Sequence, residues 1–122
     1  MITVNMNTAR FKLTVEGHAQ PEESEDYRQI CAACSALAQS LAWSVSKYND
    51  GEGAMKSFEY RPDAGNLLIR VWPEAWAEAS FRHKFRNYGD GFELLAKSHP
   101  CSVTFILDGE RVNQEKEETG NE

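Results

Sequence analysis

Two apolar periodicities alternate along this chain, and together they limit its fold more than any single motif does. Apolar residues occupy every second position in residues 2–6 and again in residues 9–15, a period typical of half-buried strands. The polar turn at residues 7–8 makes the two runs a predicted β-hairpin. After a polar loop at residues 20–26, the period becomes helical. This first helical stripe consists of Ile30, Cys34, Leu37, Leu41 and Val45.

The second half of the chain repeats the change from strand to helix. Residues 55–61 and 67–72 are two further predicted strands, and the Pro-Asp-Ala-Gly-Asn sequence at 62–66 is typical of the turn between them. A second helical stripe follows, and residues 101–107 form the last predicted strand. The stripe of this second helix consists of Phe81, Phe85, Tyr88, Phe92 and Leu95.

The sequence also predicts where the first helix begins and where the second helix ends. Asp26 and Gln29 resemble a capping box that opens the first helix. The second stripe stays in phase across Gly89 and Gly91, which predicts one helix with a weak middle, and a His-Pro pair at 99–100 stops it. The element order is therefore ββαββαβ. The predicted fold is a single α/β (α+β) domain in which two helices cover a β-sheet.

Length and composition agree with one domain. The chain has 122 residues, of which 41% are hydrophobic, enough for a core without disulfide or metal staples. We assign residues 1–108 to this domain and 109–122 to an acidic, disordered tail. The sequence has neither a signal peptide nor a membrane span, so we expect a cytoplasmic protein with three free thiols.

The formal net charge of −6 bears on the partner. An acidic surface argues against a nucleic-acid backbone as the main partner and suits a basic one. Ordinary solubility explains the same charge, so both interpretations stay open.

The best candidate chemistry is a thiol–imidazole pair, Cys31 with His18. Cys31 lies near the start of the first predicted helix, and His18 ends a predicted strand on the other side of the loop. An imidazole beside a thiol favours the thiolate, which is the nucleophile of cysteine enzymes. Glu25 or Asp26 could orient His18, as the third member of a triad does. The alternative is that Cys31 is simply a small buried hydrophobe.

The spacing of Cys31 and Cys34 also invites metal or redox interpretations. A structural zinc site needs a second ligand pair, and the remaining Cys and His residues are not arranged as one. We therefore predict no metal and no cofactor, and we expect Cys34 to pack in the core.

Three segments taken together resemble a known family: Gly-His-Ala at 17–19, Ile-Cys-Ala-Ala-Cys-Ser-Ala-Leu at 30–37, and Gly-Phe-Glu-Leu-Leu-Ala at 91–96. The chain resembles the ribosomal-processing cysteine protease (Prp, or YsxB-like) family. That resemblance implies a small homodimeric α/β protein that removes an N-terminal extension from a large-subunit ribosomal protein. Carried over by position, Cys31 is the nucleophile and His18 is the general base.

The sequence departs from the family pattern at two places. Arg28 stands where the family commonly has an aspartate, so Asp26 or Glu25 is the expected replacement. The loop after His18 lacks the family's glycine, and we expect it to face a basic peptide substrate. The residues of this predicted substrate loop are Gln20, Pro21, Glu22, Glu23 and Ser24.

These departures keep two alternatives open. One is a retargeted protease, for example one that processes a phage structural protein. The other is a catalytically silent, homodimeric interaction domain that has kept the fold. In each case we expect no nucleic-acid partner and no membrane partner.

Overall fold

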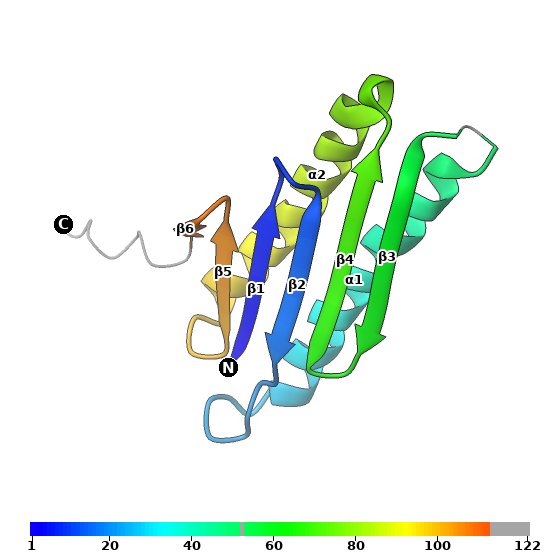
Figure 1. Ribbon diagram of the computed structural model, residues 1–122. Helices are drawn as coiled ribbons and strands as arrows, with labels where there is room; N and C mark the ends of the chain where they lie inside the picture. Colours follow the sequence, from blue (N-terminus) through cyan, green and yellow to red (C-terminus); the bar gives the residue numbers. More distant parts are fainter. Residues whose placement is uncertain (52, 113–122) are drawn as a thin grey trace.

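Both long helices lie behind one six-stranded sheet, whose other face is open (Figure 1). The computed structural model describes residues 1–51 and 53–112. The strand order is β3-β4-β2-β1-β5-β6, with β1 parallel to β5 and every other pair antiparallel. The predicted α+β class and the order ββαββαβ are confirmed. The elements are β1 (Ile2–Asn7), β2 (Lys12–Gly17), α1 (Tyr27–Asn49), β3 (Met55–Asp63), β4 (Asn66–Pro73), α2 (Glu78–Ser98), β5 (Val103–Leu107) and β6 (Glu110–Arg111).

Alternation along the strands places the core between the sheet and the helices. Val4 lies opposite Val15 on β2 and opposite Phe105 on β5, so one inward row crosses the centre of the sheet. Each of these side chains is buried. The intervening residues, such as Asn5 and Thr14, face the open side, and this explains the period of two in the sequence.

The first hairpin differs from its prediction in the length of its turn. The turn extends through Phe11, and β2 begins only at Lys12. Two sets of contacts hold this turn. The Arg10 N–H donates to Asn7 Oδ1 at 3.0 Å, and Asp108 accepts from the Thr8 N–H at 2.6 Å and from the Thr8 hydroxyl at 2.8 Å. Phe11 has a left-handed backbone, φ 55°, which turns its ring back into the core beside Phe85.

Helix α1 begins where the sequence predicted, but without a capping box. Asp26 is the N-cap residue, and its side chain makes no cap hydrogen bond. Its backbone N–H instead donates to Ser24 Oγ at 3.0 Å, so the preceding loop supplies the local contact. The predicted stripe is buried except for Leu37, which is half-buried and faces Gly91 of α2.

Helix α2 is continuous, as predicted, and Gly89 and Gly91 lie where it packs on β1 and on α1. A Cβ atom on Gly89 would lie 3.2 Å from Met6 Sδ, and one on Gly91 would lie 2.9 Å from a methyl carbon of Leu37. The glycines thus let α2 approach the sheet and α1 closely. Within the described residues, neither helix has both the length and the apolar character to cross a membrane.

The C-terminal part of the sheet differs from its prediction in two ways: β5 starts two residues later, and a short strand β6 follows it. β5 starts at Val103, because the Ser102 and Val103 N–H groups both donate to the His99 carbonyl and hold residues 99–102 in a turn. The short strand β6 pairs with β5 and lies inside the segment predicted as a tail. Residues 113–122, the rest of that predicted tail, lie outside the described residues.

Candidate active site

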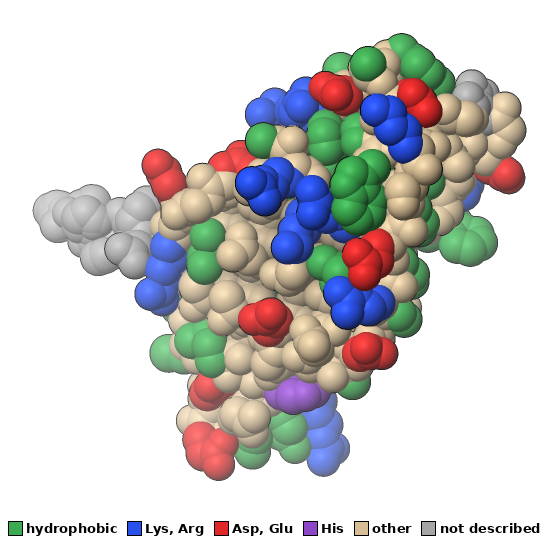
Figure 2. Space-filling model, viewed as in Figure 1, with side chains coloured by type: hydrophobic (Ala, Val, Ile, Leu, Met, Phe, Trp, Pro, Cys, Tyr) green, Lys and Arg blue, Asp and Glu red, His purple; other side chains and the backbone are tan. Residues whose placement is uncertain are grey.

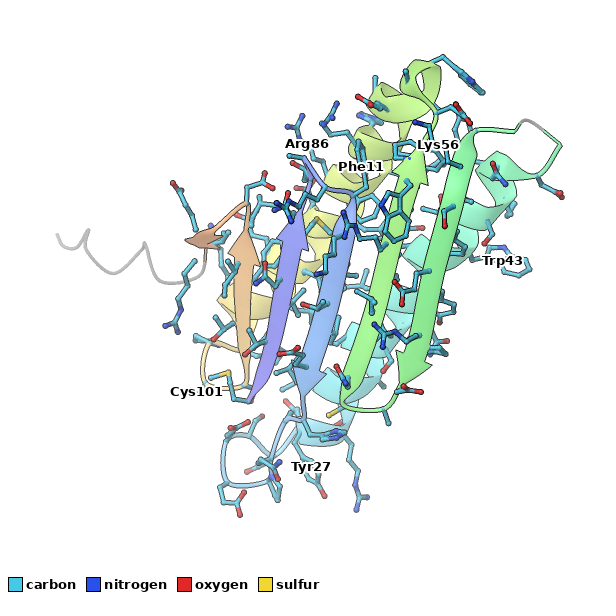
Figure 3. All side chains as sticks on the ribbon, viewed as in Figure 1. Phe11, Tyr27, Trp43, Lys56, Arg86 and Cys101 are labelled. Atoms are coloured by element: carbon cyan, nitrogen blue, oxygen red, sulfur yellow. The ribbon has the colours of Figure 1, made fainter. Side chains whose placement is uncertain are left out.

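A pocket of about 310 Å³ opens at the end of the molecule where β2 ends, α1 begins and the β3–β4 turn reverses the chain (Figure 1). Tyr27, at the first position of α1, marks this end (Figure 3). We call it the Cys31 pocket. Residues from three segments line it: Gly17 at the end of β2 with His18 after it, Cys31, Ser35 and Gln39 on α1, and Asp63 and Gly65 at the β3–β4 turn.

Cys31 contributes a half-buried thiol from the second turn of α1. Its Sγ accepts a hydrogen bond from the Ala19 backbone N–H at 3.3 Å. An N–H donor directed at sulfur favours negative charge there. Because Cys31 lies past the first turn, this donor is a closer source of stabilisation than the helix N-terminus, whose effect fades beyond that turn.

His18 reaches the same pocket from the end of β2, and its ring lies against Gly65. A Cβ atom on Gly65 would overlap His18 Nε2, and Gly65 also has a left-handed backbone with φ +77°. The Gly17 N–H donates to the Gly65 carbonyl at 2.9 Å, which ties the β3–β4 turn to the end of β2. Gly65 therefore fixes where the imidazole can lie. The sequence marked it only as a turn residue.

The structure brings His18 and Cys31 to one pocket without joining them directly. In the described part of the chain, no hydrogen bond links the His18 ring to the Cys31 thiol. In free enzymes such catalytic contacts are often long and shorten only when substrate is bound. The exposed ring of His18 is open to an incoming ligand.

The two carboxylates predicted to orient His18 do not line this pocket. Asp26 lines a different hollow with His99 at the far end of α2, and Glu25 is exposed in the loop. Asp63, the last residue of β3, lines the Cys31 pocket instead. The sequence assigned Asp63 to the turn between the two strands, whereas it is the last residue of β3. The pairing of β4 with β2 brings this end of β3 and the β3–β4 turn to the pocket.

The predicted substrate loop, residues 20–24, is closed on itself and contributes no lining to the Cys31 pocket. Glu23 fastens it: its carboxylate accepts from the Met1 ammonium at 2.7 Å and from the Gln20 N–H at 3.0 Å. The hydrogen bond from the ammonium, and then the one from Gln20, lowers the pKa of Glu23. The same ammonium donates to the His18 carbonyl at 2.7 Å, so this contact also anchors the chain at His18.

Cys34 forms the buried floor of the pocket. Burial, and then the nearby charge of Cys31, raises the pKa of the Cys34 thiol to about 12. Cys34 therefore stays a neutral thiol that packs in the core, while Cys101 is exposed beside β5 (Figure 3). Across residues 1–51 and 53–112, no group of three or more His, Cys, Asp or Glu side chains is arranged to hold a metal ion.

The fold is similar to two solved structures. SMU.848 from Streptococcus mutans superposes with a TM-score of 0.63 at 21% identity, covering 87% of this chain and 94% of that one. An essential ribosomal processing protease, Prp from S. aureus, in complex with a covalently linked product peptide, superposes with a TM-score of 0.61 at 15% identity, covering 88% and 99%. No protein-family model and no curated protein sequence matches the chain. At these identities the likeness is one of fold.

Proposed function

We propose that this protein is a cysteine endopeptidase in which Cys31 is the nucleophile and His18 is the general base. One observation carries the proposal: Cys31 Sγ, with the Ala19 N–H directed at it, lines the same pocket as the His18 ring. A nucleophile and a base that converge on one pocket from separate segments are what acyl transfer requires. The fold similarity to a ribosomal processing protease with a covalently linked product peptide supports this assignment.

The chemistry follows from these two groups. His18 takes the proton of the Cys31 thiol, and the thiolate attacks the scissile carbonyl to form a carbon–sulfur bond. The carbon–nitrogen bond then breaks as His18 gives its proton to the leaving amine. Water, activated by His18, attacks the thioester and releases the acyl product with the free thiol.

Asp63 and Gly65 are the proposed positioning residues of the base. Gly65 sets the position of the imidazole by leaving room for it, and Asp63 is the carboxylate of the pocket lining. A carboxylate near the base favours the imidazolium that forms during attack. The family commonly has an aspartate at the position of Arg28. In this proposal Asp63 supplies the carboxylate that Arg28 lacks.

The proposed substrate is the N-terminal extension of a large-subunit ribosomal protein, and the proposed active form is a cytoplasmic homodimer. The family resemblance points to this substrate, and the S. aureus neighbour, a ribosomal processing protease bound to a product peptide, supports a peptide substrate. A basic extension also suits a protein of net charge −6.

A cleavage assay tests the substrate and the nucleophile together. The host's N-terminally extended ribosomal protein is incubated with the native chain, Cys31→Ala, His18→Gln and the control Cys101→Ala, which removes an exposed thiol outside the pocket. We expect one cut by the native chain and Cys101→Ala, and none by the other two variants. Cleavage by Cys31→Ala would overturn the proposed nucleophile.

A second candidate is a catalytically silent interaction domain. It is favoured by the absence of a hydrogen bond between His18 and Cys31 within the described residues, together with Arg28 at the family's aspartate position. The rate of iodoacetamide alkylation against pH, followed by peptide mapping, separates the two candidates. An enzyme has a Cys31 that reacts below neutral pH and loses this reactivity in His18→Gln. A silent domain has a Cys31 that reacts only above about pH 8, as an ordinary thiol does.

A further inference from the structure

The open face of the sheet carries a second hollow, of about 200 Å³, near the β1–β2 turn. Lys and Arg side chains gather over this part of the face, although the protein as a whole is acidic (Figure 2). The turn is the one that contains Phe11 (Figure 3). The lining of this hollow consists of Asn5, Asn7, Arg10, Lys12 and Thr14, and it includes no carboxylate.

The basic side chains in this region neighbour one another rather than acidic side chains. Lys12 on β2 lies directly opposite Arg70 on β4, so two like charges form a cross-strand pair on the same face. Such a pair destabilises a sheet unless something neutralises it. Arg70 turns onto the Trp72 ring, 4.6 Å from its centroid, and Lys12 remains with Arg10 at the hollow.

Among the residues that the structure describes, no acidic side chain forms an ion pair with this group. Glu59 lies opposite Arg70 on β3, but its carboxylate pairs with Arg61 at 3.1 Å. Within residues 1–51 and 53–112, neither Arg10, Lys12 nor Arg70 forms an ion pair. The Nε of Arg70 is also buried without a hydrogen-bond partner among these residues.

We infer that this hollow binds a single phosphate group, either free or carried by a small molecule. Its lining offers a guanidinium, an ammonium, two amides and a hydroxyl. These groups can together donate hydrogen bonds to the tetrahedrally arranged oxygens of one phosphate. A planar carboxylate would leave most of these donors unused. The small volume and the net charge of −6 favour one phosphate over an extended polyanion. The inference is independent of the proposed protease.

A titration with inorganic phosphate at constant ionic strength tests this site. Backbone amide signals are followed by NMR in the native chain, in Lys12→Gln, and in the control Lys56→Gln, which removes an exposed positive charge on β3. We expect saturable shifts confined to residues 5–14, weakened about tenfold by Lys12→Gln and unchanged by Lys56→Gln. Shifts that do not saturate, or that both variants weaken equally, would overturn the site.

Two further arms of the titration separate the ligand classes. Acetate that binds as tightly as phosphate would overturn the assignment to phosphate. A short single-stranded RNA that binds this face and is not displaced by inorganic phosphate would overturn it in favour of a polyanion surface. Displacement of a small phosphate monoester by inorganic phosphate is the supporting result.

Discussion

The imidazole of His18 occupies the space that any side chain on Gly65 would need. His18 follows the end of β2 and Gly65 precedes the start of β4, and these ends adjoin because the two strands are antiparallel. The hydrogen bond from the Gly17 N–H to the Gly65 carbonyl holds them together. This relationship makes the β3–β4 turn part of the proposed active site.

Gly65→Ala should abolish most of the activity by displacing His18. The matched control is Gly51→Ala, because Gly51 has nearly the same φ, +76° against +77°, and a Cβ there meets no atom within 4 Å. Both variants carry the left-handed backbone cost of about 1–2 kcal/mol, so their free energies of unfolding should fall similarly. The rate of peptide cleavage should fall in Gly65→Ala and stay at the native level in Gly51→Ala. Equal activities would contradict the role of Gly65.

Asp63→Asn should lower kcat by roughly 100-fold or more while KM changes little, since removing a carboxylate that orients the base acts on the transition state. Asp63→Glu should recover part of the rate. The pH–rate profile of Asp63→Asn should also shift on its acidic limb, which a purely structural role would leave in place. Asp90→Asn, an exposed change on α2, is the control.

Glu23 makes the stability of the 18–26 region depend on pH. Its pKa is lowered in the folded protein, so its contribution to stability is present above the ordinary glutamate value of 4.5 and is lost as the pH falls through the lower folded value. The free energy of unfolding of the native chain should therefore exceed that of Glu23→Gln at pH 6. The difference should vanish in acid. A constant difference at every pH would contradict the hydrogen bond between Glu23 and the Met1 ammonium.

Two neighbouring positions on α2 test the packing of the core. Phe92 is fully buried against Phe105, whereas Leu94 is 68% exposed. Phe92→Ala should lower the free energy of unfolding by about 3–5 kcal/mol through the cavity it leaves. Leu94→Ala should change it by about 0.5 kcal/mol or less. Urea unfolding of both variants measures the contrast.

Local periodicity was enough to predict strands β1 to β5, the two long helices and their order, but not the short strand β6. The single helix across Gly89 and Gly91 was correctly predicted because its apolar stripe stays in phase. Phe11 was assigned to a strand because it is one of the apolar residues that alternate with a period of two in residues 9–15. One of the contacts that hold its turn, between Thr8 and Asp108, joins residues far apart in the sequence.

The candidate site could be predicted only where its residues fall in a motif. Cys31 and His18 were named from the sequence, and the structure brings them to one pocket. Nothing in the sequence assigned Asp63 and Gly65 to this pocket, because the pairing of β4 with β2 is what brings them there. Local pattern carries no information about that pairing. The only carboxylates named from the sequence as able to orient His18 were the nearby Glu25 and Asp26, and neither lines the Cys31 pocket.

Trapping the acyl-enzyme identifies the residue that forms the covalent bond with the substrate. The extended ribosomal protein is mixed with the native chain, quenched in acid within seconds, and analysed by peptide mass mapping. We predict that the released N-terminal extension is found as a thioester on the peptide that contains Cys31, and that Cys31→Ala gives neither this adduct nor cleavage. Cleavage without an adduct on Cys31, or an adduct on Cys101, would contradict the account.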